Sequence, residues 1–181
     1  MSKLSFAILG QLMRGSRTGY DLAQEFRDGL SQFWHAKHSQ IYPELQKLKD
    51  LGQVKVSEVR QSSRPDKKVY NITPAGECAL LEWILSPLPD APVRSELHLR
   101  THSIHLVPKD QAIAFYKNEL ARTEAEREGF EMQLARLEVA FSGIPSSENE
   151  AFSTYANLKF GMENRRQVAE WSRWLIATLK A

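Results

Sequence analysis

Cysteine is almost absent from this chain of 181 residues, in which Cys78 is the only one. A single cysteine cannot form an intrachain disulfide, and it excludes a zinc finger built on cysteine ligands. Long apolar runs are missing as well: no stretch reaches the length that spans a bilayer, and the N-terminus lacks the apolar core of a signal peptide. We therefore expect a cytosolic (cytoplasmic) protein with no membrane partner.

The sequence also lacks the motifs that mark common catalytic sites. It contains no glycine-rich phosphate loop, no nucleophile elbow and no paired-carboxylate signature. Cys78 has no local pattern that would activate its thiol, so we expect a structural residue on the inner face of a helix. Neither an enzyme nor a bound cofactor is expected.

A strong excess of one charge is missing too, because 24 Lys and Arg face 22 Asp and Glu. The composition, 42% hydrophobic and 25% charged, is that of an ordinary globular protein. The charge is unevenly placed, however: residues 1–86 carry +3 and residues 87–181 carry −1. Residues 37–68 hold 8 basic and 4 acidic side chains. A basic excess within one segment favours a partner that bears phosphates.

Two helices are predicted at the start of the chain. Residues 4–13 form a short, mostly apolar segment typical of a buried helix. Thr18 suits the N-cap of a second helix over residues 19–28, with Asp21 placed to complete a capping box. In the connector that follows, we expect Phe33 and Trp34 to fill the core beneath the third helix.

Residues 38–52 are the stretch around which the N-terminal half is organised. Ile41, Leu45 and Leu48 recur at helical spacing and make one apolar stripe. Pro43 belongs in a first turn, which confines the helix start to about residues 39–43 with Ser39 or Gln40 as cap. The opposite face carries side chains that can donate to base edges and phosphates: Gln40, Tyr42, Gln46, Lys47 and Lys49. An ordinary amphipathic surface helix would show the same pattern.

A hairpin is predicted after Gly52, which suits the left-handed stop of the third helix. Residues 54–59 are β-prone, and residues 70–72 alternate apolar with polar side chains in a second such run. The turn between them is polar and basic and contains proline. Its basic side chains are Arg60, Arg64, Lys67 and Lys68.

A fourth helix is predicted from Pro74 to about Leu85. Thr73 is a good N-cap, and proline is favoured at the first helical position. We expect its inner face to hold Cys78, Leu81 and Leu85. The order of three helices, a hairpin and a helix is that of a winged helix-turn-helix, in which the third helix enters the major groove and the hairpin tip contacts phosphates or the minor groove.

Two alternatives to DNA contact remain open for this region. The hairpin tip also fits a solvated charged turn, and a winged helix can serve as a protein-docking module without DNA binding. A polar, basic helix directly before a basic hairpin favours double-stranded DNA as the partner. The predicted fold is therefore mainly α with a small β-hairpin wing.

The two halves of the chain are separated by a proline-rich break. Three prolines fall between Ser86 and Pro92, and we place the domain boundary there. Residues 1–86 would form the DNA-binding domain and residues 87–181 a helical dimerisation domain. The second domain should begin with a helix over residues 93–106 that turns three apolar side chains inward: Val93, Leu97 and Ile104.

The clearest apolar period of the chain lies between positions 113 and 141. Steps of three and four alternate over about four heptads, which predicts a coiled-coil seam that ends near Ser142 and Gly143. The seam positions are Ile113, Tyr116, Leu120, Thr123, Arg127, Phe130, Leu134, Leu137 and Phe141. The polar members in its middle are of a kind that can fix register.

A last helix over residues 150–179 would complete an antiparallel helical hairpin. A lone hairpin leaves a broad apolar strip exposed, and the simplest cover is the same strip of a second copy. The predicted dimerisation residues are Ile113, Tyr116, Leu120, Phe130, Leu134, Leu137, Phe141, Trp171, Trp174 and Leu175. Phe160 is a further candidate, although packing within one chain is an equal alternative for it and for Trp174. A twofold dimer would present two recognition helices to half-sites ~34 Å apart in a pseudo-palindromic operator.

Several motifs together resemble the PadR family of winged-helix transcriptional regulators, and within it the AphA-like virulence and quorum-sensing activators. They are TGYDL at 18–22, the pair Phe33-Trp34, HSQIYPELQKL at 38–48, PDKKVY at 65–70 and ITPAG at 72–76. The resemblance implies a homodimer, and it implies that Tyr20, Gln40, Tyr42 and Lys47 lie at the DNA face with the basic residues of the wing. The complete set of predicted DNA-binding residues is Tyr20, Lys37, His38, Ser39, Gln40, Tyr42, Gln46, Lys47, Lys49, Arg60, Arg64, Lys67 and Lys68.

Two further kinds of ligand, a transition metal and a small aromatic compound, have candidate residues in this sequence. His98, His102 and His105 share one face of a helix, where two histidines one turn apart can bind a transition metal, but no fourth ligand is evident. Partly exposed histidines without a metal are the favoured interpretation. Some PadR-like proteins release DNA on binding phenolic acids or flat hydrophobic compounds. A pocket for such a ligand, between the domains or across the dimer, would be lined by Tyr116, Arg127, Trp171 and Trp174. The alternative is that these aromatic residues are core.

Overall fold

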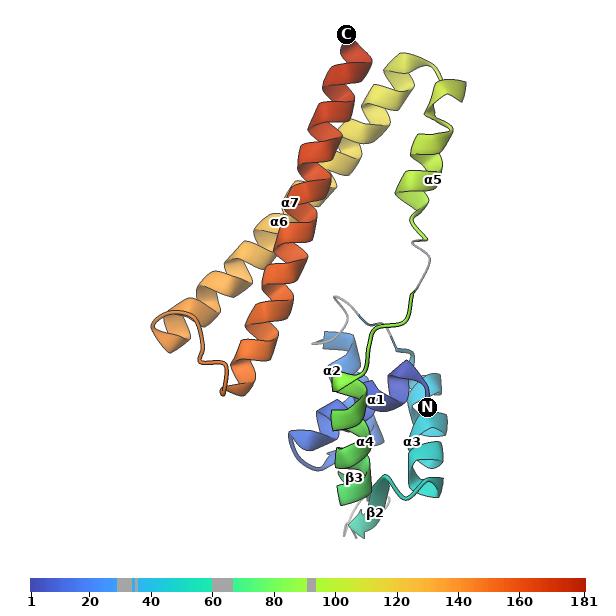
Figure 1. Cartoon of the computed structure of the whole chain (residues 1–181), viewed down its shortest axis with the longest axis vertical. Coiled ribbons are helices and arrows are strands. Elements are labelled where there is room, and N and C mark those ends of the chain that lie inside the picture. The colour runs from blue at the N-terminus through green and yellow to red at the C-terminus, as the bar shows by residue number, and fades with distance from the viewer. Residues whose placement is uncertain (29–33, 35, 60–66, 91–93) are drawn as a thin grey trace. The chain divides into compact units, whose positions relative to one another are not determined.

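The computed structural model describes residues 1–28, 34, 36–59, 67–90 and 94–181. The chain forms two compact units, Met1–Ala91 and Pro92–Ala181. Figure 1 shows both units. None of the helices in the described ranges is long and apolar enough to cross a bilayer.

The first unit packs four helices around one apolar core. They are α1 Lys3–Met13, α2 Gly19–Asp28, α3 His38–Asp50 and α4 Pro74–Leu85. Side chains from the first three helices are completely or almost completely buried: Ile8, Leu9, Leu22, Phe26, Ile41, Leu45 and Leu48. Trp34 packs against this core as predicted, while Phe33 lies outside the described residues. The apolar stripe of α3 therefore fixes which of its faces looks outward.

The predicted caps hold at α2 and α4. The N–H of Thr18 donates to the carboxylate of Asp21 over 2.9 Å, and the N–H of Asp21 donates to the Thr18 hydroxyl over 3.1 Å. These hydrogen bonds lower the pKa of Asp21. The Thr73 hydroxyl accepts from the N–H of Gly76 and donates to the carbonyl of Gly52. Thr73 thus joins the end of the α3 segment to the start of α4.

The helix α3 begins one residue before the predicted range of about 39–43. Neither Ser39 nor Gln40 is the N-cap, because the helix begins at His38 and the N-cap is Lys37. Gln40 contributes from the third helical position, where its Oε1 accepts from the N–H of Lys37 over 2.9 Å. Pro43 therefore lies inside the helix rather than in its first turn, where it has no N–H to donate to the carbonyl of Ser39. Gly52 adopts the expected left-handed conformation, with φ of +69°.

A three-stranded antiparallel sheet lies beside these helices. Its strands are β1 Arg17–Thr18, β2 Val54–Val59 and β3 Lys67–Ile72, in the order β1-β3-β2. Tyr70 pairs with Val56 on one side and with Arg17 on the other. The hairpin β2–β3 was predicted, whereas the two-residue strand β1 was not. The tip of the hairpin, residues 60–66, lies outside the described residues.

The inner face of α4 differs from the prediction. Leu81 and Leu85 are 54% and 85% exposed, and Cys78 is exposed as well. The buried face runs instead through Gly76 and Leu80. The reason is the close approach of Gly76 to the preceding loop: a Cβ there would lie 2.3 Å from the carbonyl oxygen of Gln53. This contact sets the rotation of the helix and turns the predicted face outward.

The regular elements among the described residues of the second unit are all helices. This unit contains α5 Glu96–His102, the short 3-10 helix η1 Ile104–Leu106, and the long helices α6 Lys109–Phe141 and α7 Glu150–Lys180. The single helix predicted over residues 93–106 is therefore broken at Ser103, and Val93 lies outside the described residues. The long helices run antiparallel side by side (Figure 1). Ser142, in left-handed conformation with φ of 54°, ends α6 where predicted.

The predicted seam of α6 packs against α7 of the same chain. One cluster is built around Tyr116, Leu175 and Ile176, and a second around Leu134, Tyr155 and Leu158. Between them lies the buried Thr123, whose hydroxyl donates to the carbonyl of Glu119 over 2.8 Å. The polar hydroxyl that interrupts the seam at Thr123 thus has its hydrogen-bond partner within the same helix.

Candidate nucleic-acid interface

The outward face of α3 is polar and carries every predicted contact of that helix. Its buried stripe of Ile41, Leu45 and Leu48, each 0% exposed, leaves the opposite side in water. The exposed predicted residues of this segment are Lys37, His38, Ser39, Gln40, Tyr42, Gln46, Lys47 and Lys49. Such a face, with amide, phenol and ammonium groups on one helix, matches what base edges and phosphates accept.

Several of these side chains are held in place by partners on the same helix. The Gln46 amide donates to the Asp50 carboxylate over 2.7 Å, and the Lys47 ammonium lies 2.7 Å from Glu44 Oε1. The Gln40 side chain is tied to the start of the helix through its oxygen, which leaves its NH₂ group able to donate elsewhere. These contacts restrict the rotamers of the three side chains, so less conformational entropy is lost when this face of α3 binds a partner.

Glu44 is a buried acid beneath this surface. Its Oε2 accepts from the hydroxyls of Ser2 (2.6 Å) and Ser5 (2.5 Å), and Oε1 accepts from Lys47. Burial alone would raise the pKa of this carboxyl, but the hydrogen bonds from Lys47, Ser2 and Ser5 outweigh it and lower the pKa to about 2. Glu44 is therefore ionised at neutral pH.

Two tyrosines stand near the start of α2. Tyr20 is 65% exposed and Tyr42 is 43% exposed. The Tyr42 ring lies beside the His38 ring, with 4.9 Å between their centroids, and it passes close over Gly19. The start of α2 and the first half of α3 thus form one continuous exposed surface.

Of the wing, the structure describes the two strands but not the tip between them. Lys67 and Lys68 are exposed on β3, and the charge of Lys67 contributes to the lowered pKa of Asp21 at the start of α2. Arg60 and Arg64 lie outside the described residues. Lys67 is therefore close enough to the start of α2 for its charge to act on Asp21.

The predicted dimerisation residues divide into two groups. Eight of them lie in the two clusters that join α6 to α7 within the chain: Ile113, Tyr116, Leu120, Phe130, Leu134, Leu137, Trp171 and Leu175. Phe141 and Trp174, in contrast, are 42% and 60% exposed, and Phe160 is 75% exposed. Large apolar side chains on the outside of the hairpin are the ones available to a second copy.

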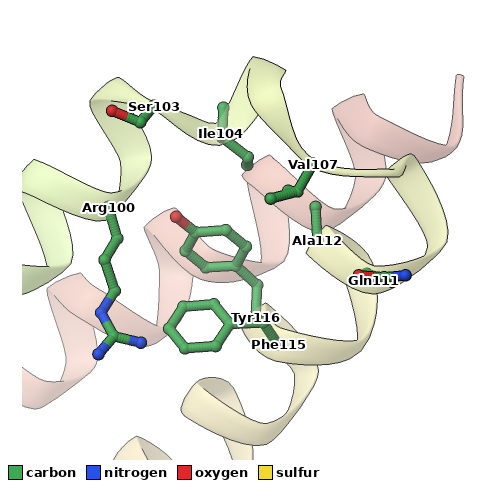
Figure 2. A pocket seen from close by; sticks show the side chains of 8 residues that line it. All are labelled: Arg100, Ser103, Ile104, Val107, Gln111, Ala112, Phe115 and Tyr116. Carbon is green, nitrogen blue, oxygen red and sulfur yellow. The ribbon is translucent and has the colours of Figure 1, made fainter.

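A cavity of about 410 Å³ lies within the second unit. Figure 2 shows its lining, which α5, the segment around η1 and the start of α6 provide together: Arg100, Ser103, Ile104, Val107, Gln111, Ala112, Phe115 and Tyr116. The Arg100 guanidinium lies 5.4 Å from the centroid of the Phe115 ring. The Tyr116 hydroxyl is 2.8 Å from that of Thr101. The site is thus mostly apolar, with one cation at its edge.

Of the residues expected to line an aromatic pocket, only Tyr116 lines this one. Trp171 lies behind it, with its ring 5.8 Å from the Tyr116 ring in an edge-on arrangement. Arg127 pairs with Glu131 further along α6, and Trp174 faces outward. Three of the four residues predicted to line a ligand pocket are thus absent from the lining of this one, and the contributions of α5 and η1 were not predicted.

Comparisons with known proteins agree with this architecture. Residues 8–82 match the transcriptional regulator PadR-like family, and residues 93–180 match the family "virulence activator alpha C-term". The negative transcriptional regulator PadR of Bacillus subtilis is 32% identical over 181 residues, which cover 99% of this chain and 98% of that protein. This chain belongs to the PadR-like family of transcriptional regulators.

Solved structures of PadR-like proteins extend the comparison to three dimensions. The structure of Bacillus subtilis PadR in complex with operator DNA has a TM-score of 0.90 at 30% identity, and covers 98% of this chain and 99% of that one. PadR in complex with p-coumaric acid has a TM-score of 0.83 at 28% identity over the same shares. The Vibrio cholerae virulence activator AphA, at 24% identity and a TM-score of 0.72, shows the shared fold over 98% of each chain.

Two features of this PadR-like surface were not predicted from the sequence. The first is that the Tyr42 ring packs directly against Gly19, where a larger residue would not fit. The second is that the hydroxyls of Ser2 and Ser5 donate hydrogen bonds to the Glu44 carboxylate. A glycine inside a capping-box motif was a usable signal for the first. For the second, Glu44 falls at the edge of the apolar stripe of α3, where an acid is unexpected. The histidines weighed as metal ligands, His98, His102 and His105, are all exposed, and the described residues contain no cluster of three or more metal-binding side chains.

Proposed function

We propose that this PadR-like chain regulates transcription by binding a pseudo-palindromic operator as a homodimer. The observation that carries the proposal is the outward polar face of α3, on which Gln46 and Lys47 are exposed. Placed in the major groove, this face would read base edges, while Lys67 and Lys68 would contact phosphates. The similarity to PadR, whose complex with operator DNA has been solved, supports this assignment.

The two units would have separate roles. We assign residues 1–86 to DNA binding and residues 87–181 to dimerisation, with the exposed Trp174, Phe160 and Phe141 as part of the contact between copies. One winged helix makes few phosphate contacts, whereas two joined copies make the second contact effectively intramolecular and raise the affinity. A homodimer also explains why an inverted repeat is the expected operator.

Selection of bound duplexes from a random pool tests this proposal most directly. We expect an inverted repeat with half-site centres ~34 Å apart, or about one helical turn. Binding to that duplex should weaken steeply with salt, because each neutralised phosphate releases a counterion. Equal affinity for selected and scrambled duplexes would refute the specific-regulator function. Complete absence of DNA binding would favour the protein-docking alternative.

The same PadR-like chain is also a candidate for release by a small aromatic acid. The supporting observations are the cavity beside Arg100 and Tyr116, and the solved complex of PadR with p-coumaric acid. An apolar wall with one cation at its edge fits a flat carboxylate, although Glu96 Oε1 already lies 3.0 Å from the Nε of Arg100 and would compete for it.

Titration of the protein with p-coumaric acid would test this second function. Trp171 lies against the cavity wall, so its fluorescence should change on binding. Arg100→Met should weaken binding about tenfold, the loss of one charge-assisted contact, whereas Arg94→Met, a matched loss of charge outside the lining, should not. No fluorescence change, or equal effects of both variants, would exclude this cavity as the ligand site.

We infer further that the chain has no enzymatic role and acts in the cytoplasm, where it can reach its operator. The family to which it belongs consists of transcriptional regulators, which supports the first inference. Because the family consists of regulators, we assign the cavity beside Arg100 to ligand binding and not to catalysis.

A further inference from the structure

We propose that Glu44 is a positioning residue for operator recognition, because its buried carboxylate holds Lys47 at one place on the outward face of α3. This inference rests on the proposed DNA-binding function and adds a specificity role for a residue that does not touch DNA. Glu44 itself is only 8% exposed, whereas the Lys47 side chain is 66% exposed. The acid is thus inside the molecule and the cation outside, joined across the surface.

Both oxygens of the carboxylate are engaged. Oε2 receives the hydroxyls of Ser2 (2.6 Å) and Ser5 (2.5 Å) from the start of α1, and Oε1 receives the Lys47 ammonium over 2.7 Å. Ser2 also caps α1 by accepting from the N–H of Ser5 over 3.0 Å. A carboxylate held from two helices cannot rotate freely, so it offers Lys47 a fixed anchor.

A fixed anchor matters because lysine is a flexible side chain. A free lysine loses much rotamer freedom when it makes a specific contact, and this loss weakens binding. Pairing with Glu44 restricts Lys47 before DNA arrives. Lys49, an exposed lysine on the same helix, has no ion pair within the described residues and serves as the internal comparison.

The carboxylate also changes the electrostatics of the interface. A negative charge beneath the surface lowers the positive potential that attracts any DNA, so it weakens binding to every sequence alike. The ion pair therefore lowers the affinity for DNA of any sequence, but it holds the Lys47 ammonium at a defined position. Removal of the charge should raise affinity for scrambled DNA while it loosens the contact that distinguishes the operator.

A double-mutant cycle tests this positioning role. Glu44→Gln, Lys47→Gln and the double variant are compared by fluorescence anisotropy on the selected operator duplex and on a scrambled duplex of equal length. We expect Glu44→Gln to lower the ratio of the two affinities about tenfold, the size of one lost specific contact. In the Lys47→Gln background the same change should have no further effect on the ratio. In a Lys49→Gln background it should have its full effect.

Controls separate this role from a purely structural one. Glu82→Gln, which removes an exposed acid from α4, reports the effect of net charge alone. Circular dichroism and thermal melting establish that each variant is folded. If Glu44→Gln does not fold, Ser5→Ala removes one of the two hydroxyl donors to Oε2 and should lower the ratio by a smaller factor.

The outcomes distinguish the inference from the function on which it rests. If the wild-type protein does not prefer the selected duplex, the proposed function fails and the positioning role with it. If the wild type is specific but the Glu44→Gln variant keeps the same ratio, only the positioning role is overturned. An effect of Glu44→Gln that persists undiminished without Lys47 would equally overturn it, because the acid would then act through another group.

Discussion

Gly19 and Tyr42 fit against each other so closely that a Cβ at Gly19 would lie 2.6 Å from Cε1 of the Tyr42 ring. Real carbon atoms do not approach this far, so any side chain at position 19 must displace the ring. Because Tyr42 is exposed, the ring can move without disrupting the core. The consequence falls on the binding surface rather than on stability.

Gly19→Ala is therefore expected to weaken operator binding about fivefold to tenfold, the loss of up to one well-placed contact. The free energy of unfolding should change by no more than ~1 kcal/mol, since alanine is the better helix former. Anisotropy and denaturant titration measure the two quantities. In a Tyr42→Ala background the substitution should no longer affect binding; a full effect there would show that the ring is not the cause.

The α6–α7 hairpin offers a matched pair of glycines. A Cβ at Gly161 would lie 2.7 Å from Cζ of Phe130, whereas one at Gly129 would meet no atom within 4 Å. Gly161→Ala should destabilise the protein by ~1–3 kcal/mol through overpacking. Gly129→Ala should stabilise it by ~0.5–1 kcal/mol through helix propensity. Urea denaturation of both variants checks this, and a shift of the same sign in both would contradict the packing described here.

Stability should depend on acid through Glu44. The pKa of its carboxyl is lowered from 4.5 to about 2 in the folded chain, so its contribution is fully present above pH 4.5 and is lost as the pH falls toward 2. Allowing for screening by solvent, the contribution is on the order of 1 kcal/mol. Thermal melting of wild type and Glu44→Gln at several pH values should show a difference that shrinks below pH 4.5. A constant difference would mean that the charge is not responsible.

The outer face of the hairpin should control oligomeric state. Trp174→Ser and Phe160→Ser remove exposed aromatic side chains that we assign to the contact between copies. Sedimentation equilibrium should show weaker dimerisation by about tenfold or more for each, because buried aromatic residues dominate interface energetics. Leu88→Ser, at a 93% exposed position in the proline-rich segment, should leave the equilibrium unchanged. Equal effects of all three would argue against this face.

Local signals were sufficient for much of the fold. The Thr18–Asp21 and Thr73–Pro74 pairs mark two helix starts by chemistry that acts within four residues, and both are found as predicted. The inner face of α4 depends instead on the approach of Gly76 to the Gln53 carbonyl, a contact between separate elements. The strand β1 was missed because two residues are too short to show a period.

For the candidate sites, the apolar period of α6 correctly marked a buried seam but could not say which helix covers it. In the structure α7 of the same chain does so at six predicted residues of α6, and Trp171 and Leu175 of α7 are part of the same two clusters. Likewise, the stripe of α3 revealed which residues face outward, while the burial of Glu44 depends on the hydroxyls of Ser2 and Ser5 from a distant part of the chain.

The short strand β1 also has a mechanical consequence. Its two residues pair with β3 and lead directly into α2. The wing is therefore joined by hydrogen bonds to the segment that contains Gly19, against which the Tyr42 ring packs. If the wing lysines bind a phosphate as proposed, a force on them is therefore transmitted to the residues that support α3 as well. In the proposed complex, a movement of the wing on the DNA would therefore be coupled to the position of α3.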